Sequence, residues 1–136
     1  MKNIWYLLFI LMSLLSCSKT EIPDDGRWGD VIQLSTKEVA LTAAKDSAII
    51  TTKGSSWWLT HVSFQDSIYA FTTDEDIPIE ADSYQMKTDA FTIAKRNDHT
   101  IFIMLHANTT GADRTMALYL EAGDYFDHIT IKQSAN

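Results

Sequence analysis

Residues 99–133 read HTIFIMLHANTTGADRTMALYLEAGDYFDHITIKQ and decide the fold of this chain. Apolar side chains alternate with other side chains in three successive segments, which are 101–106, 115–120 and 128–131. A period of two residues is typical of strands that bury one face of a sheet. Turn-forming residues separate the segments at 108–111 and 123–124. The stretch therefore predicts three consecutive strands of one sheet that has one buried face.

Five segments upstream also carry strand-like patterns, and they are 31–42, 47–52, 57–64, 67–73 and 84–95. No segment after the N-terminus shows a period of 3.6 residues, so we expect little helix. Short strands separated by frequent turn signals favour an antiparallel β-sandwich.

The segment 57–64, WWLTHVSF, has two faces that differ in apolar content. Trp58, Val62 and Phe64 share the more apolar parity, and Trp57 has the other parity. We therefore expect the first three side chains to face the core and Trp57 to be exposed.

Residues 1–16 form a predicted lipoprotein signal peptide, with an apolar run too short to span a bilayer. The segment 14–17, LLSC, resembles a bacterial lipobox, in which the signal is removed before a cysteine that then carries lipid. Cys17 is the only cysteine, so the mature domain has no disulfide. An ordinary signal peptide with an incidental cysteine is the alternative interpretation.

The lipidated Cys17 and a flexible tether occupy 17–30, and a single domain occupies 31–136. Lipid on Cys17 predicts the membrane as a partner. It also predicts a place at the outer membrane of the cell envelope, facing either the cell surface or the periplasm. The formal net charge of −7 disfavours nucleic acid as a partner.

Four segments together resemble the BACON domains of Bacteroidetes lipoproteins and polysaccharide-degrading proteins, and they are GSSWWL (54–59), DAFTI (89–93), NTTGADR (108–114) and ITIKQ (129–133). The sharpest matches within them are Asn108, Gly111, Arg114 and Gln133. The resemblance implies an all-β, immunoglobulin-like antiparallel β-sandwich of about seven strands. It also implies noncatalytic binding of glycan, polysaccharide or mucin.

Motifs of catalysis are absent from the sequence, including the Gly-x-Ser-x-Gly elbow and the glycine-rich phosphate loop. Carboxylates for a glycosidase pair are available, but their separation cannot be derived from the sequence, and they are Asp74, Glu75, Asp76, Glu80 and Glu121. We therefore expect no enzyme and no catalytic residue.

Metal and cofactor sites are not expected either. Four histidines lack the spacing of metal ligands, and they are His61, His99, His106 and His128. The acidic segment 74–76 lacks the glycine-spaced ligands of a calcium loop.

Four aromatic side chains are candidate ligand-binding residues, because exposed aromatic surface marks binding sites. Phe102 and Tyr119 have the outward parity of strands that we expect to be neighbours, and Trp57 and Tyr125 lie near turns. An alternative is that the long, acidic segment 65–83 covers this face and makes its aromatic residues part of the core.

Two functions follow as hypotheses. The first is noncatalytic glycan binding, and the second is a structural spacer or an adaptor that docks a partner protein along an edge strand. Fold analogy does not choose between them.

Overall fold

The computed structural model of the protein describes residues 29–136. Nine strands form the structure, and they are β1 (Glu38–Leu41), β2 (Asp46–Thr51), β3 (Trp58–Phe64), β4 (Ser67–Ala70), β5 (Tyr84–Lys87), β6 (Phe91–Arg96), β7 (Thr100–Leu105), β8 (Arg114–Ala122) and β9 (Tyr125–Gln133). A 3-10 turn, η2 (Thr73–Glu75), lies between β4 and β5. Cys17, the predicted signal peptide and most of the predicted tether lie outside the described residues.

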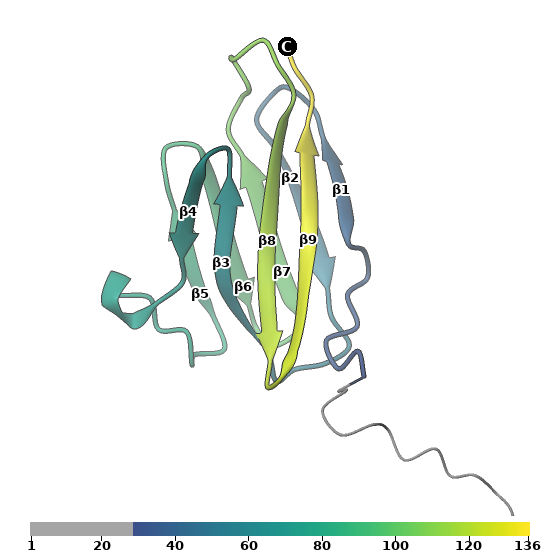
Figure 1. The fold of residues 1–136 in the computed structure, drawn as a ribbon, viewed down its shortest axis with the longest axis vertical. Coiled ribbons are helices and arrows are strands. Elements are labelled where there is room, and N and C mark those ends of the chain that lie inside the picture. Colours follow the sequence, from purple (N-terminus) through teal and green to yellow (C-terminus); the bar gives the residue numbers. More distant parts are fainter. Residues whose placement is uncertain (1–28) are drawn as a thin grey trace, which may run out of the picture.

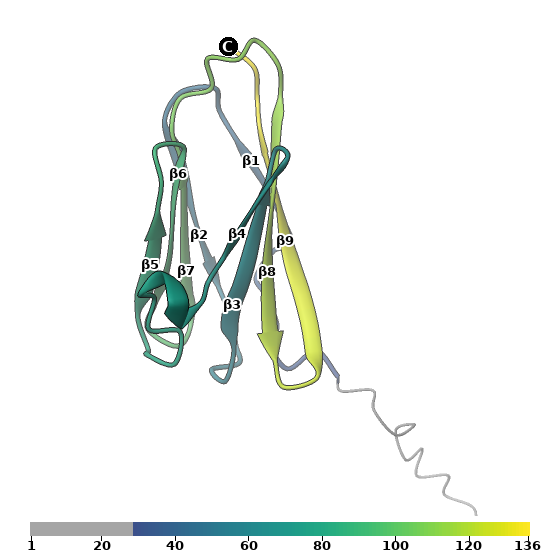
Figure 2. The same cartoon turned by 60° about the vertical axis from the view of Figure 1, so that its left-hand side comes forward.

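The strands form two packed sheets, which confirms the predicted β-sandwich. One sheet has the order β1-β9-β8-β3-β4 and the other has the order β2-β7-β6-β5. Figure 1 shows the first sheet in front of the second, and Figure 2 shows the two layers from the side. Neighbouring strands are antiparallel except for the parallel pair β1 and β9. Nine strands exceed the count of about seven that the resemblance implied.

The stretch 99–133 does not form three strands of one sheet, so that prediction is wrong. β8 and β9 form the predicted hairpin, with Gly123 at φ 61° in its turn. β7 instead pairs with β6 and β2 in the other sheet, and residues 106–113 cross between the layers. Alternation shows which side chains are buried, but it does not show which sheet a strand joins.

The core lies between the sheets and consists of the side chains that alternation predicted. Eight of them, all from β7, β8 and β9, are at most 1% exposed, and they are Ile101, Ile103, Leu105, Met116, Leu118, Leu120, Ile129 and Ile131. Burial of one such side chain stabilises the fold by about 1.5 to 3 kcal/mol. These three strands therefore supply a large part of the driving force for folding.

An irregularity in β3 changes which of its side chains face the core. Its pairing with β8 shifts between Leu59 and His61, so that Thr60 is an extra residue. Such a bulge reverses the parity of the residues on its two sides. Val62 and Phe64 face the core as predicted, at 0% and 3% exposed. The prediction for Trp58 is wrong, because this half-buried residue pairs with Glu121 on the outer face.

Two of the BACON-like residues, Asn108 and Gly111, hold the crossing segment 106–113 in place. The Asn108 side-chain amide donates to the carbonyls of Ala112 and Ser134 at 2.7 and 2.9 Å. Gly111 has a φ of 75°, which favours glycine. The crossing segment is therefore tied to the residue that follows β9.

The other two residues of the resemblance, Arg114 and Gln133, bind each other inside the sandwich. The Arg114 Nε donates to Gln133 Oε1 at 3.1 Å. The Gln133 amide donates to the carbonyls of Ala44 and His106, both at 3.1 Å. Burial lowers the pKa of the Arg114 guanidinium. The residues that carry the resemblance thus join segments from both sheets.

The segment 65–83 closes one side of the sandwich and does not cover a sheet face. Its first part forms β4, which pairs with β3 as the edge strand of the five-stranded sheet. Its later part crosses to β5 at the side of the molecule, and Figure 2 shows this crossing. Phe71 and Ile77 enter the core, at 3% and 8% exposed. The outer faces of both sheets therefore remain open to solvent.

Within residues 29–136, no helix has the length and apolar character needed to cross a membrane.

Candidate functional site

The four predicted ligand-binding residues do not come together. Trp57 lies in the core, and Tyr125 lies at the start of β9. Phe102 belongs to the four-stranded sheet, whereas Tyr119 belongs to the five-stranded sheet. Since outward side chains of the two sheets point in opposite directions, Phe102 and Tyr119 lie on opposite outer faces. The expectation that their strands are neighbours is wrong.

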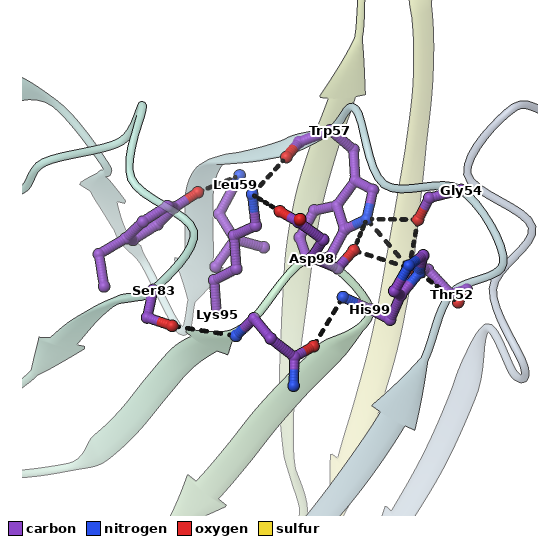
Figure 3. Close-up of polar contacts among 10 residues, drawn as sticks. Thr52, Gly54, Trp57, Leu59, Ser83, Lys95, Asp98 and His99 are labelled. Carbon is purple, nitrogen blue, oxygen red and sulfur yellow. Dashed lines mark hydrogen bonds and ion pairs between the residues drawn. The ribbon is translucent and has the colours of Figure 1, made fainter.

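Trp57 is a structural residue, and the prediction that it is exposed is wrong. Its side chain is only 2% exposed. The indole N–H faces three acceptors at 3.0 Å, which are Thr52 Oγ1 and the carbonyls of Gly54 and Asp98 (Figure 3). The Lys95 ammonium lies 4.8 Å from the ring centroid and donates to the Trp57 carbonyl at 3.0 Å. The enclosed ring has no face on which a ligand can stack.

Tyr125 takes part in an internal polar contact. Its hydroxyl donates to Asp127 Oδ2 at 3.2 Å, and the same carboxylate binds the Lys37 ammonium at 2.8 Å. Burial and the neighbouring Asp127 raise the pKa of the Tyr125 phenol. Tyr125 and Asp127 share the inward parity of Ile129. Tyr125 therefore supports the β1–β9 edge and is not part of an outer-face site.

Phe102 is partly covered by its neighbour Arg96. The guanidinium carbon lies 3.9 Å from the centroid of the Phe102 ring, in a cation–π arrangement. Ile49 pairs with Phe102 on the adjoining strand and is 62% exposed. Ile49 and Phe102 form a small apolar patch on this outer face, but the Arg96 guanidinium already covers the Phe102 ring.

Tyr119 lies in the middle of a row of three rings on the outer face of the five-stranded sheet. His61 on β3, Tyr119 on β8 and His128 on β9 are direct partners across the strands. The His61 and Tyr119 rings are 4.2 Å apart and inclined by 10°. The Tyr119 and His128 rings are 5.7 Å apart and inclined by 28°. Cross-strand partners on one face lie about 5 Å apart, which permits this stacking.

Stacking determines which parts of the row a ligand can reach. Both faces of the Tyr119 ring are occupied by the imidazoles, so its edge with the hydroxyl is what remains. Imidazole nitrogens and a phenol hydroxyl are hydrogen-bonding groups. The row therefore offers polar ring edges rather than an open stacking face at Tyr119.

Two large apolar rings border this row. Trp58 and Phe126 are both partners of Glu121, one on each side, in the next outward row of the sheet. Phe126 is 67% exposed, and Trp58 is half-buried. We call these five rings the aromatic platform, and they are Trp58, His61, Tyr119, Phe126 and His128. The platform combines apolar ring surface with polar edges and the carboxylate of Glu121.

Three short side chains form the row on the other side of the rings. Ser63, Ala117 and Thr130 are cross-strand partners there. Short side chains leave the edges of the three rings raised above this part of the sheet. An elongated ligand would therefore have room along the platform.

Among the platform residues, only Tyr119 was predicted as a ligand-binding residue. The histidines were considered only as metal ligands, although the β8–β9 hairpin pattern places His128 beside Tyr119. The bulge at Thr60 hid Trp58, because alternation along β3 gives the wrong parity before it, whereas the parity of His61 after it is unaffected. Within the described part of the chain, no group of three or more His, Cys, Asp or Glu side chains could hold a metal ion.

No family model and no curated protein matches the sequence. Among solved structures, an NMR structure of a protein from Bacteroides thetaiotaomicron is similar, with a TM-score of 0.63 and 20% identity. The similarity covers 85% of this chain and 97% of that protein. The protein from Bacteroides thetaiotaomicron therefore has the same fold over nearly its whole length.

Parts of two larger enzymes are also similar, at lower scores. One is a Bacteroides ovatus GH5 xyloglucanase in complex with a XXXG heptasaccharide, with a TM-score of 0.48, 18% identity and coverage of 77% of this chain and 19% of that chain. The other is an endo-fucoidan hydrolase from glycoside hydrolase family 107, with a TM-score of 0.47, 10% identity and coverage of 79% and 14%. Of these three structures, the protein from Bacteroides thetaiotaomicron alone has a score that supports a shared fold.

Proposed function

We propose that this chain is a noncatalytic, BACON-type module of the cell envelope that binds glycan chains at the aromatic platform. One observation supports the proposal most strongly. Apolar ring surface and polar ring edges lie side by side on the outer face of the five-stranded sheet. Phe126 is the most exposed apolar ring of the platform, at 67%. The row from His61 to His128 lies beside it.

The energetics of sugar binding require both kinds of surface. A pyranose stacked on one ring buries roughly 100 Å² of apolar area, worth about 2 to 3 kcal/mol. Even millimolar affinity needs about 4 kcal/mol. Polar groups must supply the difference, and the Tyr119 hydroxyl, the imidazoles and Glu121 are such groups. Phe126 and Trp58 supply the apolar part of the same surface.

The noncatalytic part of the proposal rests on the chemistry of the platform. Within the two cross-strand rows that contain the five rings, Glu121 is the one carboxylate, whereas a glycosidase needs a second one facing it. No cysteine nucleophile follows residue 17, and the catalytic motifs named above are absent from the sequence. The platform is suited to holding a sugar without cleaving it.

Binding to a glycan array tests the proposal, using the soluble chain from Ser18 onward. We expect binding of at least one polysaccharide or mucin glycan with a dissociation constant at or below the millimolar range. Phe126→Ala removes the exposed ring and should weaken that binding about tenfold or more, which corresponds to about 1.4 kcal/mol. Phe102→Ala, on the opposite sheet, is the matched control and should leave binding unchanged. Absence of binding at millimolar glycan would refute the proposal.

Membrane anchoring through Cys17 is the second part of the proposal. The sequence supports it through the lipobox-like segment 14–17 before a lone cysteine. More than one acyl chain is needed for firm anchoring, and a lipobox cysteine provides this. We expect the wild-type chain in the outer-membrane fraction and the Cys17→Ala chain outside it. An intact Cys17 thiol in the exported protein, shown by mass spectrometry, would contradict this part alone.

A further inference from the structure

A cleft of about 370 Å³ opens between the edge strands β4 and β5, at the side of the sandwich. Its walls combine apolar and polar side chains, among them Ile68, Tyr69, Ile77, Gln85, Met86 and Lys87. In Figure 2 these two strands border the side that the η2 segment crosses. The cleft lies at the edge of the sheets and none of the five platform rings lines it, although its lining residue Ala70 is the cross-strand partner of His61.

The backbone of β5 has a free hydrogen-bonding side at this cleft. Thr88 N donates to Phe91 O at 2.9 Å, which makes this pair hydrogen-bonded in the β5–β6 hairpin. Antiparallel strands alternate such pairs with pairs whose N–H and C=O groups point away. Gln85 and Lys87 therefore direct their backbone groups to the free side. Within residues 29–136, neither residue makes a backbone hydrogen bond on that side.

The other edge strand of the four-stranded sheet, β2, is partly covered by the chain itself. There the N-terminal part of the domain bonds to the end of β2, with Ser35 N donating to Thr51 O at 2.8 Å. Leu34 and Thr52 form an isolated β-bridge at the same place. The chain thus protects part of its β2 edge and leaves the β5 edge free over its four residues.

The spacing of the free groups matches an extended polypeptide. Gln85 and Lys87 each offer one donor and one acceptor, repeated every two residues, or about 6.6 to 6.8 Å. A neighbouring strand has this same repeat, and it can satisfy all four groups. Its alternate side chains would enter the cleft toward Tyr69, Ile77 and Met86. We propose that β5 binds an extended segment of a partner protein as an additional strand of this sheet.

Charge selects the kind of partner. Lys87 is exposed and lies on the outward parity of β5. An edge lysine disfavours pairing with an identical edge, where two lysines would approach each other. It favours a segment with an acidic side chain at the outward position beside Lys87, whereas Glu75, which also lines the cleft, disfavours an acidic side chain that points into it. The expected partner segment therefore has apolar residues at alternate positions and a glutamate or aspartate between them.

A synthetic peptide tests this site directly. The probe is a capped heptapeptide in which valine alternates with threonine and one central outward residue is glutamate. Titration of ¹⁵N-labelled protein should shift the Gln85 and Lys87 amides and slow their hydrogen exchange. A peptide with lysine in place of glutamate should bind about threefold more weakly, as expected for an exposed ion pair. Absence of shifts at millimolar peptide, or shifts confined to Ile68 and Ala70 on β4, would overturn the proposal.

Two controls separate strand addition from other contacts. Gln85→Pro removes a free N–H and, since that N–H does not bond to β6, should preserve the fold while weakening peptide binding about tenfold. Gln85→Ala keeps the N–H and should bind as the wild type does.

Peptides methylated at a single backbone nitrogen give a test that needs no protein variant. Methylation should abolish binding when it removes an N–H that faces β5, which is every second amide, and should leave binding intact at the amides between them. Strand addition would be refuted if methylation weakened binding equally at every peptide amide. It would also be refuted if the Gln85 amide shifted on addition of oligosaccharide and not on addition of peptide. A failure here leaves glycan binding at the platform untouched, and the reverse also holds.

Discussion

The His61 and Tyr119 rings lie face to face on neighbouring strands, with centroids 4.2 Å apart and planes inclined by 10°. His128 approaches the other side of Tyr119, at 5.7 Å. The central ring is therefore held upright between two imidazoles. The sheet therefore fixes the position of the Tyr119 hydroxyl before a ligand arrives. This lowers the entropic cost of immobilising the side chain on binding.

The hydroxyl of Tyr119 should contribute to glycan binding separately from its ring. Tyr119→Phe keeps the stack and removes the hydrogen-bonding group, so affinity for the bound glycan should fall about threefold to tenfold. The free energy of unfolding should change by less than about 0.5 kcal/mol, because the edge is on the surface. Calorimetric titration and urea unfolding measure the two effects. Unchanged affinity would place the ligand away from the row.

Trp57 should matter for stability and not for binding. Trp57→Phe removes the N–H that lies between three acceptors and leaves a gap in the core, so we expect a loss of about 2 to 4 kcal/mol. The adjacent Trp58→Phe on the outer face is the matched control and should cost less than about 1 kcal/mol. Urea unfolding followed by circular dichroism compares them. The reverse order of losses would contradict the placement of the two rings.

Gln133 should be one of the most sensitive polar positions in the domain. It is 0% exposed and links Arg114 to carbonyls in two loops. Gln133→Leu leaves the guanidinium without this acceptor, so we expect a loss of about 2 to 4 kcal/mol. Lys132→Ala, at an exposed neighbour, should cost less than about 0.5 kcal/mol. Thermal unfolding of both variants tests the difference, and equal midpoints would argue against the role of the buried cluster.

Tyr84 should make the domain sensitive to alkaline pH. Its hydroxyl accepts a hydrogen bond from Leu59 N at 2.8 Å, and burial raises its pKa from 10.0 to about 12. The fold favours the neutral phenol, so this contribution is complete below the unfolded pKa of 10.0. It is lost as the pH rises through about 12, on the order of 2 kcal/mol.

Comparison with Tyr84→Phe isolates this effect from other alkaline titrations. The variant lacks the titrating group but also leaves Leu59 N without an acceptor, which costs about 1 to 3 kcal/mol at neutral pH. The stability advantage of the wild type should therefore shrink between pH 10 and 12. Urea unfolding across this range measures it. An advantage that stays constant would contradict the raised pKa.

Local alternation in the sequence was sufficient for much of the fold. It predicted the sandwich, the β8–β9 hairpin and the inward side chains of the last three strands. These features depend on neighbours along the chain, since a strand that buries one face must place apolar residues at every second position. The residues of the BACON resemblance could be identified as well, but their hydrogen bonds to one another could not.

The aromatic platform and the position of Trp57 were decided only by the tertiary structure. His61 and Tyr119 lie far apart along the chain, and their contact depends on the pairing of β3 with β8 and on the bulge at Thr60. The sheet that β7 joins depends in the same way on hydrogen bonds to β6 and β2. The sequence by itself thus determined which side chains of β7, β8 and β9 are buried, because burial in these regular strands follows a two-residue period. Which strands pair, and in which register, is set by long-range backbone hydrogen bonds and by the packing of two sheets, and the site exists only where those pairings bring its rings together.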